Sequence, residues 1–398
     1  MKVSSRGLAV TGSPTLAINA KAKALKAEGL DVVGFGAGEP DFDTPEFVRD
    51  AAKEALDQGM TRYTPAGGSA DLQKAVCEKL WRDNGLRYAP SQIVISNGAK
   101  QSLFNTFMAL CNPGEEVLIP CPYWVSYPEI VKMAGGIPVP VMGSPENDFK
   151  PTAEEIESKV TDKTRAIILT SPNNPNGYVF TREELTAIGN LAVKHDFYIV
   201  ADEIYEFLIY DGLEHVSIAS ICPEFYDRTV TINGVSKAYA MTGWRIGYTA
   251  CPENVAKAMV NYQSHSTSGP NTIAQYAAMK ALQGPTEDRE KMVAEFARRK
   301  NRIVELINAI PGISCVEPKG AFYVMMKVSG LFGRKTTDGD VITDDMSFAK
   351  LLLSRNLVAV VPGTGFAAPE YVRLSYAISM ETIEKGITRI GDFVRDLQ

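Results

Sequence analysis

The chain is poor in the side chains that most metal centres and charge-relay triads need. Among its 398 residues there are only three histidines, His195, His215 and His265, and its six cysteines are scattered without a Cys-x-x-Cys pair. Cysteines spaced in this way are typical of free thiols in a reducing compartment, and they do not indicate structural zinc. The few histidines leave little material for a histidine-based metal site or a Ser-His-Asp triad. We therefore expect no bound metal.

Long apolar runs and blocks of positive charge are missing as well. No run approaches the roughly 18 residues of a membrane span, and the N-terminus lacks the apolar segment of a secretory signal peptide. The net charge is −6, which argues against a general nucleic-acid binder. With 45% hydrophobic and 22% charged residues, the composition is that of an ordinary globular protein. We expect a cytoplasmic protein without a membrane or nucleic-acid partner.

Short apolar runs alternate with helix signals through the middle of the chain. Five β-rich runs predict strands at 116–119, 165–169, 197–200, 229–232 and 246–249. Between two of these runs, Thr181 and Glu184 form a capping box that opens a helix, and Asn97 is a further candidate cap for a helix that ends near Cys111. Strands that alternate with helices in this way indicate βαβ units and a mainly parallel sheet.

The last third of the chain has a different pattern. A long charged helix runs from about residue 285 to residue 310, and two alternating strand patterns follow at 321–326 and 371–376. This order indicates a smaller α+β domain. We expect three parts: an N-terminal arm at 1–15, a small domain built from 16–47 with 286–398, and a large α/β domain at 48–285.

Two charged residues directly follow or end apolar strands. Lys237 lies just after the strand at 229–232, where ligands of open α/β sheets bind, and a desolvated lysine there becomes a nucleophilic amine. Taken alone, it is better interpreted as a surface lysine in a loop. Asp202 ends another apolar run, and the protonated ring nitrogen of pyridoxal phosphate (PLP) is one cation that such a carboxylate could pair with. A helix N-cap or an arginine ion pair explains Asp202 equally well.

Other segments offer groups for a phosphate, a flat ring or a carboxylate. Arg245 stands between two glycines, and the segment 97–100 offers backbone amides at a helix N-terminus, both suited to phosphate. Asn174 lies in a proline-rich loop after a strand, Trp124 could stack on a ring, and Arg373 could hold a carboxylate through two hydrogen bonds. In isolation each of them has a simpler explanation. Arg245 and the segment 97–100 could belong to a turn or a cap, Asn174 to a turn, Trp124 to core packing and Arg373 to an edge strand facing water.

Seven ordered segments together resemble the class I PLP-dependent aminotransferases of fold type I, and most closely the bacterial aspartate aminotransferase branch. The resemblance covers nearly the whole chain. The segments are GAGEPDF at 36–42, PYWVSYP at 122–128, SPNNP at 171–175, DEIY at 202–205, SK at 236–237, GWRIG at 243–247 and VRLSY at 372–376. The family implies an α/β fold, in which the large domain has a mainly parallel seven-stranded sheet and a smaller α+β domain accompanies it.

The resemblance implies a role for each residue around the cofactor ring. Lys237 would bind PLP covalently and then move the proton between the substrate Cα and the cofactor. Asp202 would pair with the pyridine nitrogen, while Asn174 and Tyr205 would donate hydrogen bonds to the phenolic oxygen. Trp124 would stack on the ring and, like Asn174, contact the substrate.

The resemblance also implies a phosphate site. Ala99 and Lys100 would bind the phosphate through their backbone amides, and Arg245 through its side chain. Some relatives have a phosphate-binding serine three residues before the lysine, where this chain has Gly234. Ser236 is expected to compensate for that departure.

Substrate groups are assigned by the same resemblance. Gly38 and Arg373 would hold the α-carboxylate, the side chain of Lys100 would pair with the distal carboxylate of aspartate, and Thr15 would add a hydrogen bond. Branch members that also use prephenate are helped by an N-terminal lysine, where this chain has Thr11.

The expected activity is transfer of the amino group of L-aspartate to 2-oxoglutarate by a ping-pong cycle on PLP, with L-glutamate and the 2-oxo acids as the other ligands. Tyr63 would reach the phosphate of a neighbouring subunit, which implies a homodimer with shared active sites. An aromatic, alanine or prephenate aminotransferase, or a β-lyase of the same fold, is the alternative.

Overall fold

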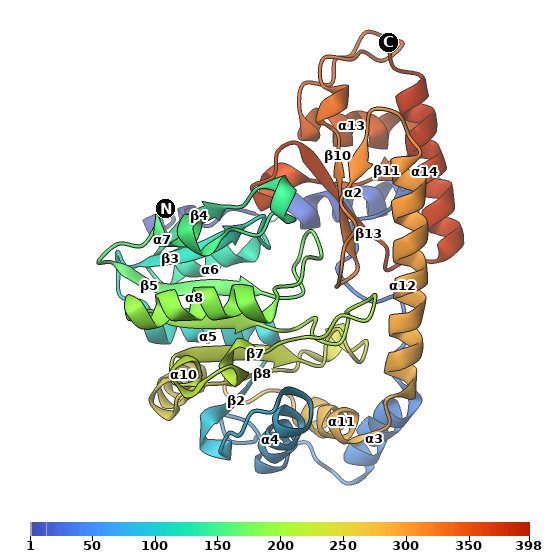
Figure 1. Ribbon diagram of the computed structural model, residues 1–398. Coiled ribbons are helices and arrows are strands. Elements are labelled where there is room, and N and C mark those ends of the chain that lie inside the picture. The colour runs from blue at the N-terminus through green and yellow to red at the C-terminus, as the bar shows by residue number, and fades with distance from the viewer. Residues whose placement is uncertain (1, 13) are drawn as a thin grey trace.

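A seven-stranded sheet forms the centre of the larger part of the molecule (Figure 1). The computed structural model describes residues 2–12 and 14–398, apart from the side chains of residues 5, 6, 14–17 and 19. In sheet order the strands are β2 (Ile93–Ser96), β8 (Gly247–Ala250), β7 (Thr229–Gly234), β6 (Tyr198–Asp202), β5 (Thr164–Thr170), β3 (Glu116–Cys121) and β4 (Ile137–Met142). Only β8 runs antiparallel to its neighbours, β2 and β7. The predicted mainly parallel, seven-stranded sheet is confirmed.

Both faces of this sheet are covered, which explains why its strands read as continuous apolar runs. Along β5, Ile168 packs in the cluster that includes helices α5 (Ala99–Leu110), α6 (Ser126–Met133) and α10 (Glu253–Ser266). The alternate residues Ile167 and Leu169 pack on the other face, with α7 (Ala153–Glu157), α8 (Arg182–Lys194) and α9 (Pro223–Tyr226). The capping box of Thr181 and Glu184 is present at the start of α8, as predicted.

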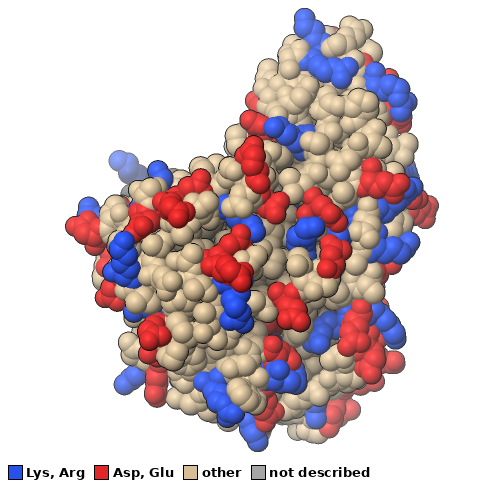
Figure 2. Space-filling model, in the orientation of Figure 1, with Lys and Arg blue, Asp and Glu red and all other residues tan. Residues whose placement is uncertain are grey.

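Three further helices close the β2 edge, namely α3 (Glu46–Asp57), α4 (Ala70–Asn84) and α11 (Thr272–Gln283). A short helix α1 (Ser5–Leu8) precedes α2 (Pro14–Ala27) at the N-terminus. No helix in the described part of the chain is both long and apolar enough to cross a bilayer. On the face drawn in Figure 2, acidic and basic side chains are interspersed, so neither sign forms a continuous patch there.

The C-terminal part contains an antiparallel sheet in the order β12 (Val361–Pro362), β13 (Tyr371–Ser375), β10 (Tyr323–Lys327), β9 (Ser314–Cys315). The long helix α12 (Glu287–Asn308), with α13 (Asp345–Asn356) and α14 (Met380–Arg395), packs on it (Figure 1). A parallel pair, β1 (Val33–Gly34) with β11 (Val358–Ala359), brings the N-terminal segment to this part. Because β13 lies between β10 and β12, Arg373 stands on an inner strand and not on an edge.

Candidate functional site

A cavity of about 420 Å³ opens where the carboxyl ends of the parallel strands meet the start of α5 and strand β13. Most of the residues assigned to the site from the sequence line it: Gly38, Ala99, Lys100, Trp124, Asn174, Asp202, Tyr205, Ser236, Lys237, Arg245 and Arg373. These residues come from every part of the chain. The sheet brings them together because the ends of β5, β6 and β7 lie at one edge.

Lys237 is half-buried in this cavity, three residues after the end of β7. Its Nζ donates a hydrogen bond to the carbonyl of Gly38 and lies 5.8 Å from the ring centre of Tyr205 and 5.6 Å from that of Phe322. Desolvation lowers the pKa of Lys237 to about 8, although the charge of Glu39 opposes the shift. About a tenth of the amine is therefore neutral, and nucleophilic, at pH 7.

Asp202 is 4% exposed, at the last position of β6. Its Oδ2 accepts a hydrogen bond from the Tyr127 hydroxyl at 2.7 Å, and its Oδ1 accepts one from the amide of Ile204 at 3.3 Å. Burial raises the pKa of Asp202 to about 6, against the lowering effect of Tyr127. Among the described residues no helix begins at Asp202 and no arginine pairs with it, so a bound cation is the partner that this buried carboxylate fits.

A narrow cradle surrounds the start of α5. Gly98 precedes the helix with φ 82°, and a Cβ there would lie 2.3 Å from Nη2 of Arg245. A Cβ at Gly247 would lie 2.2 Å from the amide nitrogen of Ala99. The helix cap is Gly98, so the prediction that Asn97 caps this helix was wrong. The carbonyl of Asn97 instead accepts from Arg245 at 3.4 Å. Backbone amides at a helix start beside a guanidinium form a site for a phosphate.

There is a steric reason for Gly234, which stands where some relatives have a phosphate-binding serine. A Cβ at this position would lie 2.9 Å from both Cα of Gly247 and the carbonyl oxygen of Ile246, so a serine does not fit there. Ser236 is buried and lines the cavity nearby.

Arg373 is 2% exposed, and the interpretation as an edge-strand charge facing water was wrong. Its guanidinium donates to Asn174 Oδ1 at 3.1 Å and to the Gly36 carbonyl at 3.3 Å, and it lies 4.4 Å from the ring centre of Tyr323. Its Nε is buried without a hydrogen-bond partner among the described residues. A guanidinium that lines a cavity and has an unused N–H donor suits a carboxylate ligand.

Lys100 is a further cationic residue that lines the cavity. Its Nζ lies 4.7 Å from the ring centre of Trp124. Desolvation, with a smaller contribution from the charge of Arg245, lowers the pKa of Lys100. The cavity therefore holds two separate cationic groups, Lys100 and Arg373, besides Lys237 and the phosphate cradle.

The lining residues that were not singled out in the sequence include Tyr127, Tyr323 and Glu39. Tyr127 bonds Asp202, the Tyr323 hydroxyl lies 3.1 Å from that of Tyr205, and Glu39 accepts from the Thr242 hydroxyl at 2.7 Å. Tyr127 and Glu39 belong to motifs at 122–128 and 36–42, so motif membership was the available signal. Nothing local distinguishes Tyr323 from other strand tyrosines.

The two other predicted residues are Tyr63 and Thr15. Tyr63 is 96% exposed, between α3 and α4. Thr15 belongs to α2, and its side chain lies outside the described residues.

The family model for aminotransferases of class I and II matches residues 30–390. The chain belongs to this family. It is 50% identical over 394 residues to an aspartate aminotransferase of Bacillus subtilis, covering 99% of both chains. It is 46% identical to an aspartate/prephenate aminotransferase of Cereibacter sphaeroides, covering 98% of this chain and 97% of that protein.

Solved structures agree with this assignment. The aspartate aminotransferase of Rhizobium meliloti superimposes with a TM-score of 0.97 at 41% identity over the whole of both chains. That of Thermus thermophilus with maleate has a TM-score of 0.93 at 45% identity, covering 99% of this chain and all of that one. As a member of the family, the protein is an aminotransferase that uses PLP. The cradle at Gly98, the buried carboxylate of Asp202 and the amine of Lys237 fit that cofactor.

Proposed function

We propose that the protein is an aspartate aminotransferase, which transfers the amino group of L-aspartate to 2-oxoglutarate. The observation that carries the proposal is the presence of two cationic side chains, Arg373 and Lys100, in one cavity beside Lys237. Two cationic groups suit a substrate with two carboxylates. The names of the relatives from B. subtilis and R. meliloti, and the dicarboxylate maleate with the T. thermophilus enzyme, support the same substrate class.

PLP, when bound, supplies an electron sink that stabilises negative charge at the substrate Cα. The residues of the cavity would hold its different ends. The amides of Ala99 and Lys100 with the Arg245 guanidinium would bind the phosphate, and the Asp202 carboxylate would pair with the protonated ring nitrogen. Because burial raises the pKa of Asp202 to about 6, a cationic partner there relieves the cost of that buried charge.

Lys237 would carry the cofactor and act as the base at the substrate Cα. An amine with a pKa of about 8 can both accept and return a proton near neutral pH. The Gly38 carbonyl accepts from its Nζ, and this contact orients the amine in the cavity. Arg373 would hold the α-carboxylate and Lys100 the distal one, so the Cα–H bond is presented to Lys237 in one orientation.

The same proposal includes the cellular location, the assembly and the domain organisation of the enzyme. We infer a cytoplasmic homodimer, in which the exposed Tyr63 reaches the phosphate site of a second copy. We also infer a small domain of 16–47 with 286–398 beside a large domain of 48–285. The packing of Val33 and Phe35 in one apolar cluster with α12, α13 and α14 supports the first of these groupings.

Prephenate is a second candidate acceptor, because relatives at 44–46% identity are named aspartate/prephenate aminotransferases. In this chain Thr11 stands where the resemblance places a helpful lysine. Its amide and hydroxyl both donate to Glu129 at 3.0 Å, so it offers no positive charge to a substrate.

The proposal is tested by absorbance. The protein loaded with PLP should show the visible band of a lysine-bound cofactor. L-Aspartate should remove that band with release of one equivalent of oxaloacetate, and 2-oxoglutarate should restore it. The Lys237→Ala variant serves as the control, since it cannot form the covalent link. A band that does not respond to L-aspartate contradicts the proposal.

A further inference from the structure

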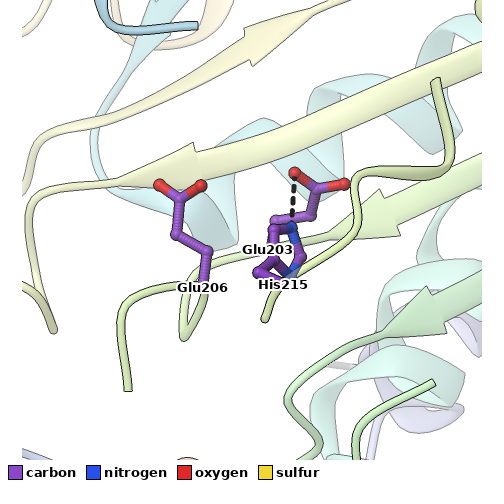
Figure 3. A group of neighbouring side chains, drawn as sticks. All are labelled: Glu203, Glu206 and His215. Carbon is purple, nitrogen blue, oxygen red and sulfur yellow. Dashed lines mark ion pairs between the residues drawn. The ribbon is translucent and has the colours of Figure 1, made fainter. Parts of the chain in front are cut away.

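Behind the cofactor side of the cavity lies a buried cluster of charged residues that the mechanism above does not use. The turn after β6 places Asp202 and Tyr205 on the cavity side. Glu203 and Glu206 come from the same turn and are buried, but they do not line the cavity. Figure 3 shows Glu203 paired with His215 and Glu206 beside them.

Glu206 is fully satisfied by donors from two elements. Lys79 of α4, which is 1% exposed, forms a short ion pair with Glu206 Oε1. Asn233 of β7 donates to the same oxygen at 2.8 Å, and Asn84 donates to Oε2 at 2.9 Å. The turn is therefore tied both to α4 and to the strand that leads to Lys237.

Glu203 has fewer partners. The Ser217 hydroxyl donates to its Oε1 at 2.8 Å, and His215 Nε2 lies 3.2 Å from its Oε2. The His215 side chain is 9% exposed. The ring nitrogens of His215 and Glu203 Oε2 have no well-aligned hydrogen bond among the described residues, so this ion pair depends on charge.

Glu203, Glu206 and His215 could in principle hold a metal ion, since their ligand atoms lie within 4.8 Å of one another. The ammonium of Lys79 already lies against Glu206, and a metal ion would be repelled by it. The cluster is better explained by charge balance. Two carboxylates, Glu203 and Glu206, face Lys79 and His215. The nearby Asp83 lies 3.9 Å from Lys79 and is paired with Arg82 at 2.7 Å.

We propose that His215 is a positioning residue for the cofactor-binding turn. As an imidazolium paired with Glu203, it completes a neutral buried cluster, and it thereby keeps Asp202 charged and ready to pair with the cofactor ring nitrogen. This inference rests on the proposed function, because it concerns the same PLP site.

The coupling follows from the adjacency of the two carboxyls. The charge of Glu203 raises the pKa of Asp202, in addition to the larger effect of burial. Desolvation lowers the pKa of His215, but the charges of Glu203 and Glu206 outweigh it and raise that pKa overall, although Lys79 opposes them. Without the imidazolium, Glu203 would be left uncompensated in a buried place, and Asp202 would take up a proton more readily.

The charge state of His215 is tested first. Because the chain has three histidines, selective nitrogen-15 labelling gives a histidine spectrum that single substitutions assign. In the full-length protein without PLP, we expect both ring nitrogens of His215 to be protonated at neutral pH. A neutral His215 ring would overturn the proposal, and this result does not depend on whether the protein uses aspartate.

The coupling is tested by PLP affinity, measured by equilibrium dialysis. His215→Gln should weaken PLP binding once the pKa of Asp202 rises past the assay pH, by about tenfold for each further unit. The double variant His215→Gln/Glu203→Gln removes both charges and should regain the affinity of the unmodified protein. His195→Gln is the matched control, since His195 pairs with Glu157 at 2.8 Å outside the cavity and the substitution should leave affinity unchanged.

Two outcomes would overturn the coupling: unchanged affinity in His215→Gln, or a double variant that binds as weakly as the single one. If His215→Gln does not fold, the double variant still tests the coupling. A role of His215 in packing alone predicts that the double variant folds and binds PLP no better than the single one. Failure of the unmodified protein to bind PLP would instead refute the proposed function.

Discussion

The side chain of Lys100 should decide the preference for a dicarboxylic substrate, and Lys100→Ala tests this. The Nζ of Lys100 lies 4.7 Å from the Trp124 ring centre, and Lys100 and Arg373 both line the cavity. A hydrogen bond to a charged group contributes about 1.5–3 kcal/mol. Its loss should lower kcat/KM for L-aspartate by about tenfold to a hundredfold.

The same substitution removes other interactions that do not depend on the substrate. The contact with Trp124 contributes about 0.5–1 kcal/mol at an exposed position. It is lost for every substrate, whereas the backbone amide of residue 100 remains available for the phosphate. L-Alanine has no distal carboxylate, so its kcat/KM should fall only by the amount due to the lost contact with Trp124. The ratio of the two losses isolates the pairing of Lys100 with the distal carboxylate.

The assay is a single-turnover measurement of the loss of the visible band, with L-aspartate and with L-alanine. Lys100→Arg is the control that keeps the charge, and it should retain part of the preference for aspartate. Equal losses for the two amino acids in Lys100→Ala would refute the assignment of the distal carboxylate to this side chain.

Four further predictions follow from individual groups. Arg373→Lys should lower kcat/KM for L-aspartate and L-alanine alike, since both have the α-carboxylate and lysine cannot form the paired hydrogen bonds; a loss confined to aspartate would contradict this role. Gly98→Ala should weaken PLP binding in dialysis, while Gly333→Ala, with φ 89° but open space, should not. In the protein without PLP, burial raises the pKa of Asp202 from 3.8 to about 6, so its charge destabilises the fold above that pH. Asp202→Asn should therefore raise the free energy of unfolding at neutral pH, by at most about 3 kcal/mol, while it weakens PLP binding; denaturant titration and dialysis measure the two effects. The rate at which PLP attaches to Lys237, followed by absorbance, should rise with pH and level off above about 8, because only the neutral amine reacts.

Local sequence signals were sufficient for several elements of the fold, although strands β2 and β4 were not predicted. The capping box at Thr181 was recognisable because both partners lie within four residues, and it is present. The apolar runs that form β3, β5, β6 and β7 were equally visible, since a strand buried on both faces has no polar alternation. The order of seven motifs also predicted the family, which the matched model confirms.

Local signals failed where a distant residue decided the outcome. Asn97 had the chemistry of a cap, yet the helix is capped by Gly98, whose φ of 82° favours glycine and where a Cβ would lie 2.3 Å from the Arg245 guanidinium. Arg373 could have been an edge charge, and only the pairing of β13 with both β10 and β12 buries it. The domain boundaries remain a prediction.

The sequence by itself therefore determined which residue types were available and in what order, including the lysine, the aspartate and the arginine of the site. Only the tertiary structure decided their chemical state. Lys237 meets Gly38 across 199 residues of chain, and Tyr127 meets Asp202 across 75. Burial and through-space charge set the pKa of Lys237 to about 8 and that of Asp202 to about 6. These effects depend on distances in space, and the separation of two residues along the chain does not give the distance between them in space.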